Sequence, residues 1–246
     1  MRSSAHRARP GDDDCAIEPA LATYAEWGLG VVRGLFEPYE IPVLAAEADR
    51  VVAAAADGDR YGYDRLPDGR RVVERIRRVA ELSPAFAGLR EDARLTGLAA
   101  AALGEPVAVV TDTLLVKWPG TGDRAAHRNG ARLTAAGVPA TAIVTVLLAL
   151  DPVTVTHGTP EFFPGLRHVA PPVTAESKLR VASRTLDDEW SLMPELAAGD
   201  VTLFDALLPH RTGVNRGDSV RRLFALSFAP VRYASLRCLR TGTLDR

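Results

Sequence analysis

The sequence is short of several residue types, and each shortage excludes a class of protein. It holds two cysteines in 246 residues, Cys15 and Cys238, and their positions fit neither a disulfide framework nor a zinc or redox motif. We expect both thiols to be reduced, as in a cytoplasmic protein. No run of 18 apolar residues predicts a membrane span, and no apolar segment near the start of the chain predicts a secretory signal.

An excess of charge of one sign is also missing. The 30 Lys and Arg residues nearly balance the 31 Asp and Glu residues, and the formal net charge is −1. Nucleic-acid-binding domains usually carry a basic face, so we expect no nucleic-acid partner. Without a membrane span we also expect no membrane partner. No sequence feature specifies an oligomeric state.

The composition nevertheless supports a folded domain of ordinary size. Hydrophobic residues make up 47% of the chain, which is enough for a sizeable core. Residues 1–16 are mostly polar, with Gly, Pro and an acidic run, and we expect them to form a disordered tail. The remaining residues, 17–246, are expected to form a single domain that carries any catalytic site.

Helical patterns come first along the chain. Residues 24–36 predict a short helix that leads into a strand, and residues 37–57 give the clearest helical stripe. Residues 91–103 predict a second good helix, which Gly104 ends. The segment 57–70 is rich in Gly, Asp and Arg and is expected to be a loop.

Strand patterns follow. Residues 107–118 alternate and are rich in Val, Thr and Leu, and the apolar run 140–150 predicts a strand buried on both faces. Residues 173–194 show weak periodicity and predict a long loop. Shorter strands are expected at 153–155, 161–163, 201–204 and 223–229. Helices followed by many short strands indicate an α+β fold with a β-sandwich or barrel.

The segment 199–222 carries the first candidate site. Pro209 ends a buried strand, His210 follows it, and Arg221 opens the strand 223–229 after a turn. If these two strands pair as an antiparallel hairpin, the imidazole and the guanidinium reach one pocket. That pair suits a metal ligand beside an anion clamp. A surface histidine beside a solvated arginine is the alternative interpretation.

His127 and Asn129 form a second candidate. Residues two apart in an extended segment point to the same side, so both side chains can converge on one ion. A His-x-acid pair with a distant histidine is the facial triad of non-haem iron oxygenases. Here the acid position holds an asparagine.

The order of these features resembles the phytanoyl-CoA dioxygenase family of iron(II)/2-oxoglutarate oxygenases, over roughly residues 24–233. The resemblance depends on the joint order and spacing of short motifs, no one of which is specific. In chain order they are Lys117, Pro119-Gly120, His127-x-Asn129, Leu150-Asp151-Pro152, His157-Gly158, the 163–168 turn, Gly199-Asp200, His210, Asn215 and Arg221.

The resemblance implies a double-stranded β-helix, a jelly-roll or cupin-like barrel flanked by N-terminal helices. Iron(II) would be held by His127, Asn129 and His210 at the barrel mouth, and O2 would be consumed. The 2-oxoglutarate cosubstrate would contact the side chains of Lys117, Thr212 and Arg221. The implied reaction is hydroxylation or a related oxidation of a small organic molecule, in specialised metabolism or another biosynthetic or catabolic pathway.

The resemblance also bears on the substrate. The family members that this chain looks most like act on small polar compounds, including phosphonates. Arg124, Arg128 and Arg167 flank the expected mouth, where they would favour an anionic substrate or, alternatively, be solvated loop charges.

Asn129 departs from the family pattern, because a neutral amide oxygen is a weaker ligand than a carboxylate. Four interpretations follow. The amide ligates and turnover is slow, iron chemistry is lost, a halide occupies an iron position, or the Asn129-Gly130 pair deamidates and regenerates an acid. An engineered Asp-to-Asn change is a further origin for this residue.

Two other functions compete with the oxygenase. The first is a metal-poor relative of the same fold that catalyses a non-redox step or only binds a ligand. The second is a zinc or cupin-type hydrolase or isomerase that uses His127, His157 and His210. His157 and His168 otherwise belong to loop and turn architecture.

Overall fold

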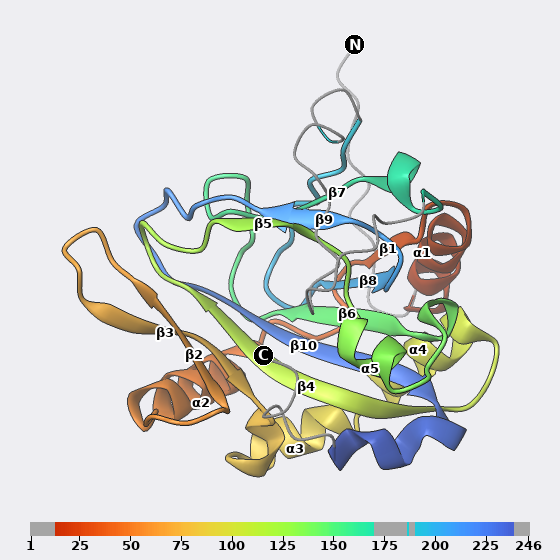
Figure 1. Cartoon of the computed structure of the whole chain (residues 1–246), viewed down its shortest axis with the longest axis horizontal. Coiled ribbons are helices and arrows are strands. Elements are labelled where there is room, and N and C mark those ends of the chain that lie inside the picture. Colours follow the sequence, from red (N-terminus) through yellow and green to blue (C-terminus); the bar gives the residue numbers. More distant parts are fainter. Residues whose placement is uncertain (1–12, 170–185, 187–189, 239–246) are drawn as a thin grey trace.

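The computed structural model describes residues 13–169, 186 and 190–238. Its strands form two antiparallel sheets that face each other (Figure 1). The seven-stranded sheet has the order β1 (Leu29–Val32), β8 (Val201–Asp205), β6 (Val144–Ala149), β10 (Arg221–Pro230), β4 (Val107–Lys117), β3 (Arg71–Arg77) and β2 (Tyr61–Arg65). The three-stranded sheet has the order β5 (Arg124–His127), β9 (His210–Thr212) and β7 (Pro160–Phe162).

Helices cover the outer face of the large sheet (Figure 1). They are α1 (Asp13–Trp27), α2 (Ile41–Ala53), α3 (Pro84–Arg90) and α4 (Ala93–Leu103), while the short α5 (Ala131–Ala135) follows β5. This arrangement confirms the predicted α+β fold with a jelly-roll of two facing sheets and helices outside.

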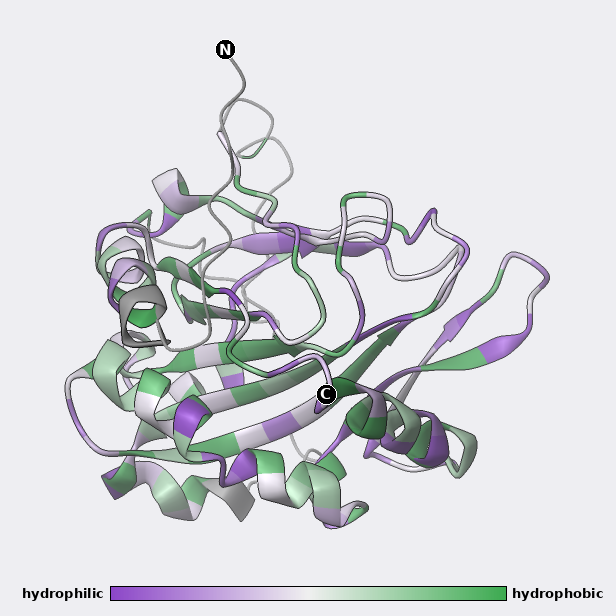
Figure 2. Cartoon of the chain, turned by 180° about the vertical axis from the view of Figure 1, so that it is seen from behind, coloured by the Kyte–Doolittle hydropathy of each residue, from purple (hydrophilic) through white to green (hydrophobic). Residues whose placement is uncertain are grey.

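The strand β6 shows why the core forms where it does. All six of its residues are buried, as the apolar run predicted. Val144, Val146 and Leu148 pack with the helices in the main core, whereas Leu147 and Ala149 belong to a second cluster on the opposite, inner face. The colours in Figure 2 follow this pattern, with hydrophobic residues concentrated along the central strands.

The predicted helices at 37–57 and 91–103 are confirmed, and each is shorter than predicted. In α2 the buried positions Ile41, Leu44, Ala48 and Val51 recur at helical spacing, which places one apolar face on the sheet. Helix α4 ends at Gly104, whose backbone lies in the left-handed region with a φ of 71°. The expected helix and strand within 24–36 are the end of α1 followed by β1.

Three expectations about strands were wrong. The expected loop 57–70 contains β2, which pairs with β3 as a hairpin that extends from the body of the protein (Figure 1). A register shift beside Gly62 interrupts the strand pattern there. The strands at 201–204 and 223–229 do not form a hairpin, because β6 lies between β8 and β10. Val153 forms an isolated bridge with Leu196 where a short strand was expected.

Some expectations concern residues that the structure does not describe. The expected tail overlaps α1 at residues 13–16, and residues 1–12 lie outside the described residues. Most of the expected loop 173–194 and the side chains of Cys15 and Cys238 lie outside them too. Within the described residues, no helix is both long enough and apolar enough to cross a membrane.

Candidate metal and cosubstrate site

A cavity of about 420 Å³ lies between the two sheets and brings the predicted site residues together. Its lining includes His127, Asn129, His210, Lys117, Thr212 and Arg221. The chain crosses from the large to the small sheet three times, after β4, β6 and β8. The crossings after β4 and β8 place β5 beside β9, so the residues converge without the hairpin that the sequence suggested.

The two histidines occupy directly opposed positions on β5 and β9. His127 pairs with His210 in the strand register, and their ring centroids are 4.4 Å apart. His127 Nδ1 lies 3.0 Å from the carbonyl oxygen of Ala125, and His210 Nδ1 lies 3.1 Å from that of Leu208. A carbonyl accepts hydrogen bonds only, so each Nδ1 carries the proton, and Nε2 carries the lone pair that binds metal.

The surroundings of His210 keep its imidazole neutral. Burial, and then the neighbouring His127, lower the pKa of His210 to about 3, against a smaller rise from the Leu208 carbonyl. The ring packs against Phe204 and Phe162, with centroids 4.9 and 5.6 Å away. A neutral imidazole is the form that ligates metal, so at neutral pH a metal displaces no proton from His210.

Asn129 is held from the floor of the cavity. Its Nδ2 donates to Thr145 Oγ1 at 3.2 Å, and Thr145 Oγ1 lies 3.4 Å from Ser227 Oγ. With the amide nitrogen fixed in this way, Oδ1 is the atom that can ligate a metal. No group of three His, Cys, Asp or Glu side chains in the described part of the chain could hold a metal. The donor set that fits is therefore two imidazoles and one amide oxygen, all neutral.

Lys117 and Arg221 form a buried pair of cations at the other end of the cavity. They are register partners on β4 and β10, and both donate to the carbonyl oxygen of Gly158, at 3.2 and 3.0 Å. Lys117 Nζ also donates to the carbonyl oxygen of Gly213 at 2.6 Å. Gly158 has φ of +68°, and a Cβ there would lie 2.9 Å from Lys117 Nζ. The glycine in the His157-Gly158 motif therefore allows this close approach.

The two cations lack a carboxylate partner, so the chemistry of this end of the cavity suits an anion. Within the described ranges, neither Lys117 nor Arg221 forms a salt bridge, and Arg221 Nε is buried without a hydrogen-bond partner. Burial, and then the charge of Arg221, lower the pKa of Lys117 to about 7. Burial lowers the pKa of Arg221 to about 10, with Asp151 opposing it. A carboxylate from a ligand would supply the missing charge and fit the orphaned N–H group.

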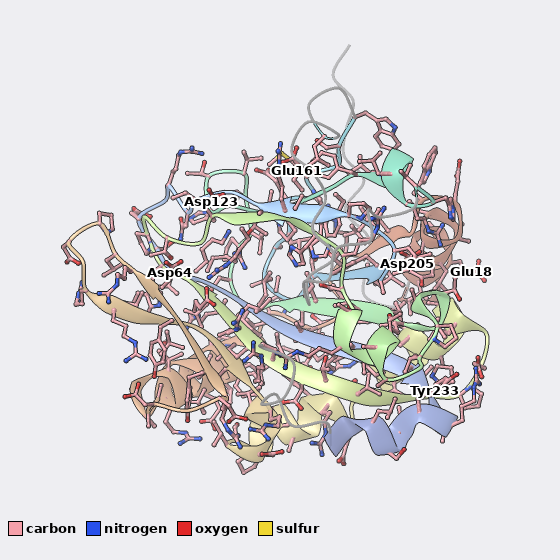
Figure 3. All side chains as sticks on the ribbon, viewed as in Figure 1. Glu18, Asp64, Asp123, Glu161, Asp205 and Tyr233 are labelled. Carbon is pink, nitrogen blue, oxygen red and sulfur yellow. The ribbon has the colours of Figure 1, made fainter. Side chains whose placement is uncertain are left out.

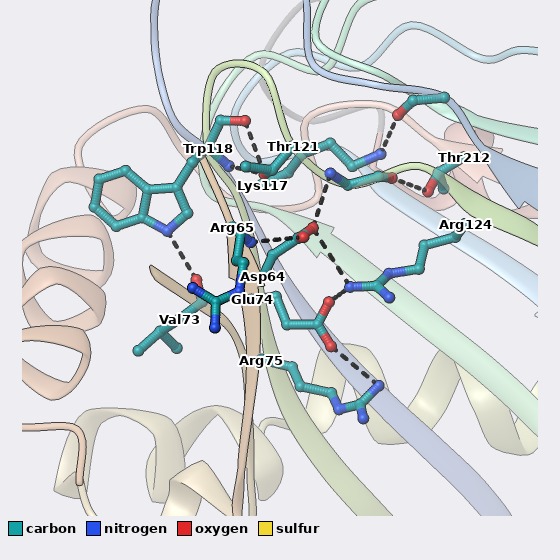
Figure 4. Close-up of polar contacts among 12 residues, drawn as sticks. Asp64, Arg65, Val73, Glu74, Arg75, Lys117, Trp118, Thr121, Arg124 and Thr212 are labelled. Carbon is teal, nitrogen blue, oxygen red and sulfur yellow. Dashed lines mark hydrogen bonds and ion pairs between the residues drawn. The ribbon is translucent and has the colours of Figure 1, made fainter. Parts of the chain in front are cut away.

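Thr212 also lines this end, although its hydroxyl already has an acceptor. Thr212 Oγ1 donates to the carbonyl oxygen of Gly122 at 3.2 Å (Figure 4). A hydroxyl has a single hydrogen, so it must leave Gly122 before it can donate to a carboxylate.

The arginines expected at the mouth have three different roles. Arg124 lines the cavity and is paired with Glu74, which also contacts Arg75 at 3.3 Å (Figure 4). Arg128 is buried, and its guanidinium donates to the carbonyl oxygens of residues 166, 169 and 207. Arg167 pairs with Asp205 and does not contribute to the cavity lining.

The remaining candidates lie elsewhere. His157 bonds Thr154 and Ser219, at 2.8 and 3.1 Å, and lines a separate cavity. His168 is exposed. The geometry therefore does not support a three-histidine zinc site. Four carboxylates labelled in Figure 3, Asp64, Asp123, Glu161 and Asp205, are absent from the cavity lining.

Several of the residues that line the cavity were not identified from the sequence. Thr145 and Ser227 are hydroxyls on inward faces of apolar strands, and a buried polar residue in such a run is an informative signal. Glu74 and Arg75 lie in the hairpin segment that was not recognised. Arg132 lies on α5, which is too short for helical periodicity to reveal.

A double-stranded β-helix that brings two histidines and a third side chain to one cavity resembles the 2-His-1-carboxylate sites of non-haem iron(II) oxygenases, with Asn129 in the place of the carboxylate. Comparison with known proteins then identifies the family. The model of the phytanoyl-CoA dioxygenase (PhyH) family matches residues 24–223. The chain belongs to this family.

Individual relatives are more distant. Dioxygenase lolE1 of Epichloe uncinata is 29% identical over 118 residues, which are 48% of this chain and 44% of that protein. The crystal structure of EvdMO1 has a TM-score of 0.75 and 22% identity, over 88% of this chain and 50% of that one. This chain thus spans about half the length of either protein.

A third relative was solved with ligands. The epimerase SnoN, in complex with Fe3+, alpha ketoglutarate and nogalamycin RO, has a TM-score of 0.72 and 22% identity. The match covers 89% of this chain and 85% of that one. At such identities the structural matches establish the fold, which confirms the double-stranded β-helix.

Proposed function

We propose that this protein is an iron(II)- and 2-oxoglutarate-dependent oxygenase that hydroxylates or otherwise oxidises a small organic molecule. The observation that carries the proposal is the meeting of a histidine pair and two buried cations that lack a carboxylate partner in one cavity. A keto-acid that chelates a metal at one end and carries a carboxylate at the other fits both groups. When bound, iron and the cosubstrate supply the oxidising chemistry with O2.

The residues of the chain have separate tasks in this scheme. Nε2 of His127 and Nε2 of His210 hold the metal, and Oδ1 of Asn129 completes the protein ligands. Arg221 and Lys117 bind the distal carboxylate of the cosubstrate. The apolar lining, which includes Leu115, Leu147 and Phe204, limits the access of water.

Asn129 sets the expected strength of metal binding. Replacing a carboxylate by an amide removes one negative charge from the metal site, so iron(II) should bind more weakly than it would to a carboxylate. The hydrogen bond from Nδ2 to Thr145 keeps the amide oriented and therefore favours ligation by Oδ1.

The proposal is tested by anaerobic reconstitution with iron(II) and 2-oxoglutarate, followed by addition of O2 and measurement of succinate. We expect succinate release that requires both additions and is lost in His210→Ala and Arg221→Met. Failure of the folded wild-type protein to release succinate at saturating iron and cosubstrate would contradict an oxygenase function.

A second function is favoured by the neutral donor set. A protein that binds 2-oxoglutarate or a similar dicarboxylate without iron turnover would keep the Lys117–Arg221 end and lose the metal chemistry. The same assay separates the two functions, because cosubstrate binding without succinate release supports the non-redox protein. The cytoplasmic location and the biosynthetic role stay predictions from the sequence.

A further inference from the structure

The floor of the cavity has two ends that lie far apart. Arg221 and Ser227 are six residues apart on β10, and a strand advances about 3.3 Å per residue, so roughly 20 Å separates them. Thr145 is the register partner of Ser227 and holds Asn129. The cavity therefore runs from an Arg221 end to an Asn129 end.

A cation lies at the Asn129 end as well. Arg132 comes three residues after Asn129, in the first turn of α5, and its partly buried side chain lines the cavity. Among the residues that the structure describes, none forms a hydrogen bond or an ion pair with the Arg132 guanidinium. A guanidinium has five donors, and at this position all of them are available to a ligand.

The other basic side chains of the lining already have acceptors. Arg124 pairs with Glu74, Arg128 donates to backbone carbonyls, and Arg221 donates to Gly158. Arg75 contacts Glu74, the one carboxylate among the described lining residues. The cavity therefore carries a net positive charge, and Arg132 is the lining cation whose side chain has neither a hydrogen bond nor an ion pair with a described residue.

The rest of this end limits what can bind. Leu133 and Leu147 supply apolar walls, while Thr111 and Ser227 supply hydroxyls. The whole cavity, at about 420 Å³, lies near the lower limit for small-molecule sites and has to hold the cosubstrate too. A compact molecule with a short carbon skeleton fits the remaining space.

We propose that Arg132 anchors the acidic group of the substrate, which is a small organic carboxylate or phosphorylated or phosphonate compound. The fork of the guanidinium binds such oxyanions through two parallel hydrogen bonds, which fixes orientation as well as position. The anchored molecule extends from α5 toward the histidine pair. Its assignment as the substrate rests on the proposed oxygenase function, whereas the anion site itself does not.

The experiment uses three probes that carry the same butyl chain: pentanoate, butylphosphonate and pentanamide. Ligand-observed NMR titrations are run on the metal-free protein with 2-oxoglutarate saturating the Arg221 end. We expect pentanoate or butylphosphonate to bind wild type, and to bind Arg132→Gln at least about tenfold more weakly. Pentanamide should bind more weakly than the preferred anion, and its affinity should not change in the variant. The two anions show which oxyanion the site prefers.

Arg216→Gln is the matched control, because Arg216 is an exposed arginine outside the cavity and its loss changes the net charge equally. This variant should bind the anions as wild type does. Equal anion binding by Arg132→Gln and wild type would overturn the proposal. An equal preference of wild type for pentanamide and the anions would overturn it as well, even if the variant failed to fold.

A parallel titration separates this proposal from the oxygenase function. In an Arg221→Gln background without cosubstrate, anion binding should still depend on Arg132. If 2-oxoglutarate does not bind wild type but this dependence holds, the oxygenase proposal fails and the anion site stands. If 2-oxoglutarate binds and the dependence is missing, the anion site fails alone.

Discussion

The cation pair and the histidine pair of the cavity stand on different sheets and differ in their chemistry. Lys117 and Arg221 stand on β4 and β10, strands of 11 and 10 residues that pair along nearly their whole length. His127 and His210 stand on β5 and β9, strands of four and three residues with an irregular register. The cation pair, to which the proposed function assigns the cosubstrate, has every charge that a carboxylate requires. The histidine pair, to which it assigns the metal, has Asn129 beside it in place of a carboxylate. Binding of cosubstrate and of metal should therefore respond to different mutations.

The largest effect is expected at the cosubstrate end. Arg221→Met removes a buried guanidinium that faces the anion site, so 2-oxoglutarate affinity should fall by about 100-fold or more. Calorimetry on metal-free protein gives the affinity, and Arg221→Lys shows how much the charge restores without the fork. An unchanged dissociation constant in Arg221→Met would place the cosubstrate elsewhere.

The next effect lies at the metal end. Asn129→Asp supplies a charged ligand oxygen, so iron(II) affinity should rise by about 10- to 100-fold while metal-free cosubstrate binding stays the same. Anaerobic iron titrations measure it, with Asn129→Ala as the comparison that removes the ligating oxygen. Peptide mass spectrometry of the wild type verifies that residue 129 is still an amide, since the following Gly130 favours deamidation. Identical iron affinities in all three proteins would show that residue 129 is not a ligand.

A smaller effect is expected at Thr145, which holds the side chain of Asn129 by a hydrogen bond. Thr145→Val removes the hydroxyl that accepts from Asn129 Nδ2 and leaves the shape of the side chain nearly unchanged. The amide loses its fixed orientation, so iron(II) affinity should fall by about tenfold. Thr111→Val, on the same cavity floor but without a hydrogen bond to Asn129, is the matched control. Equal losses in both variants would point to a general change of the cavity.

The smallest effect is a pH dependence at the cosubstrate end. Lys117 has a pKa lowered to about 7, so its charge is present below pH 7 and is lost as the pH rises through that value. An anionic cosubstrate is attracted by the charged form, so its affinity should fall by about threefold to tenfold between pH 6 and pH 8. Lys117→Met should remove the pH dependence. A slope that survives in this variant would assign the titration to another group.

The sequence predicted the large-sheet elements better than the small-sheet ones. Long apolar or alternating runs revealed β4, β6, β8 and β10, and the spacing of buried residues revealed α2 and α4. Strands of three or four residues, such as β5 and β9, give too few positions for a period to be recognised. The polar β2–β3 hairpin was missed because its side chains are mostly only partly buried.

The residues of the site also divide into those that the sequence predicted and those that it did not. The six predicted site residues were chosen from the order of motifs, and all of them line the cavity. The expected route to their meeting was wrong, because strand order is not a local property of the sequence. Arg132 and Thr145 were missed because their positions relative to Asn129 depend on register and on the short helix α5. Local patterns locate candidate ligands, while their supporting residues require the three-dimensional arrangement.

The central claim is that the histidine pair and the cation pair bind one and the same molecule. The most direct measurement is an anaerobic absorption titration with iron(II) and 2-oxoglutarate. The account predicts a weak visible metal-to-ligand charge-transfer band in the wild type, which is lost in His210→Ala and needs far more cosubstrate in Arg221→Met. A folded wild type that shows no band at saturating concentrations, or an Arg221→Met titration identical to wild type, would contradict the account.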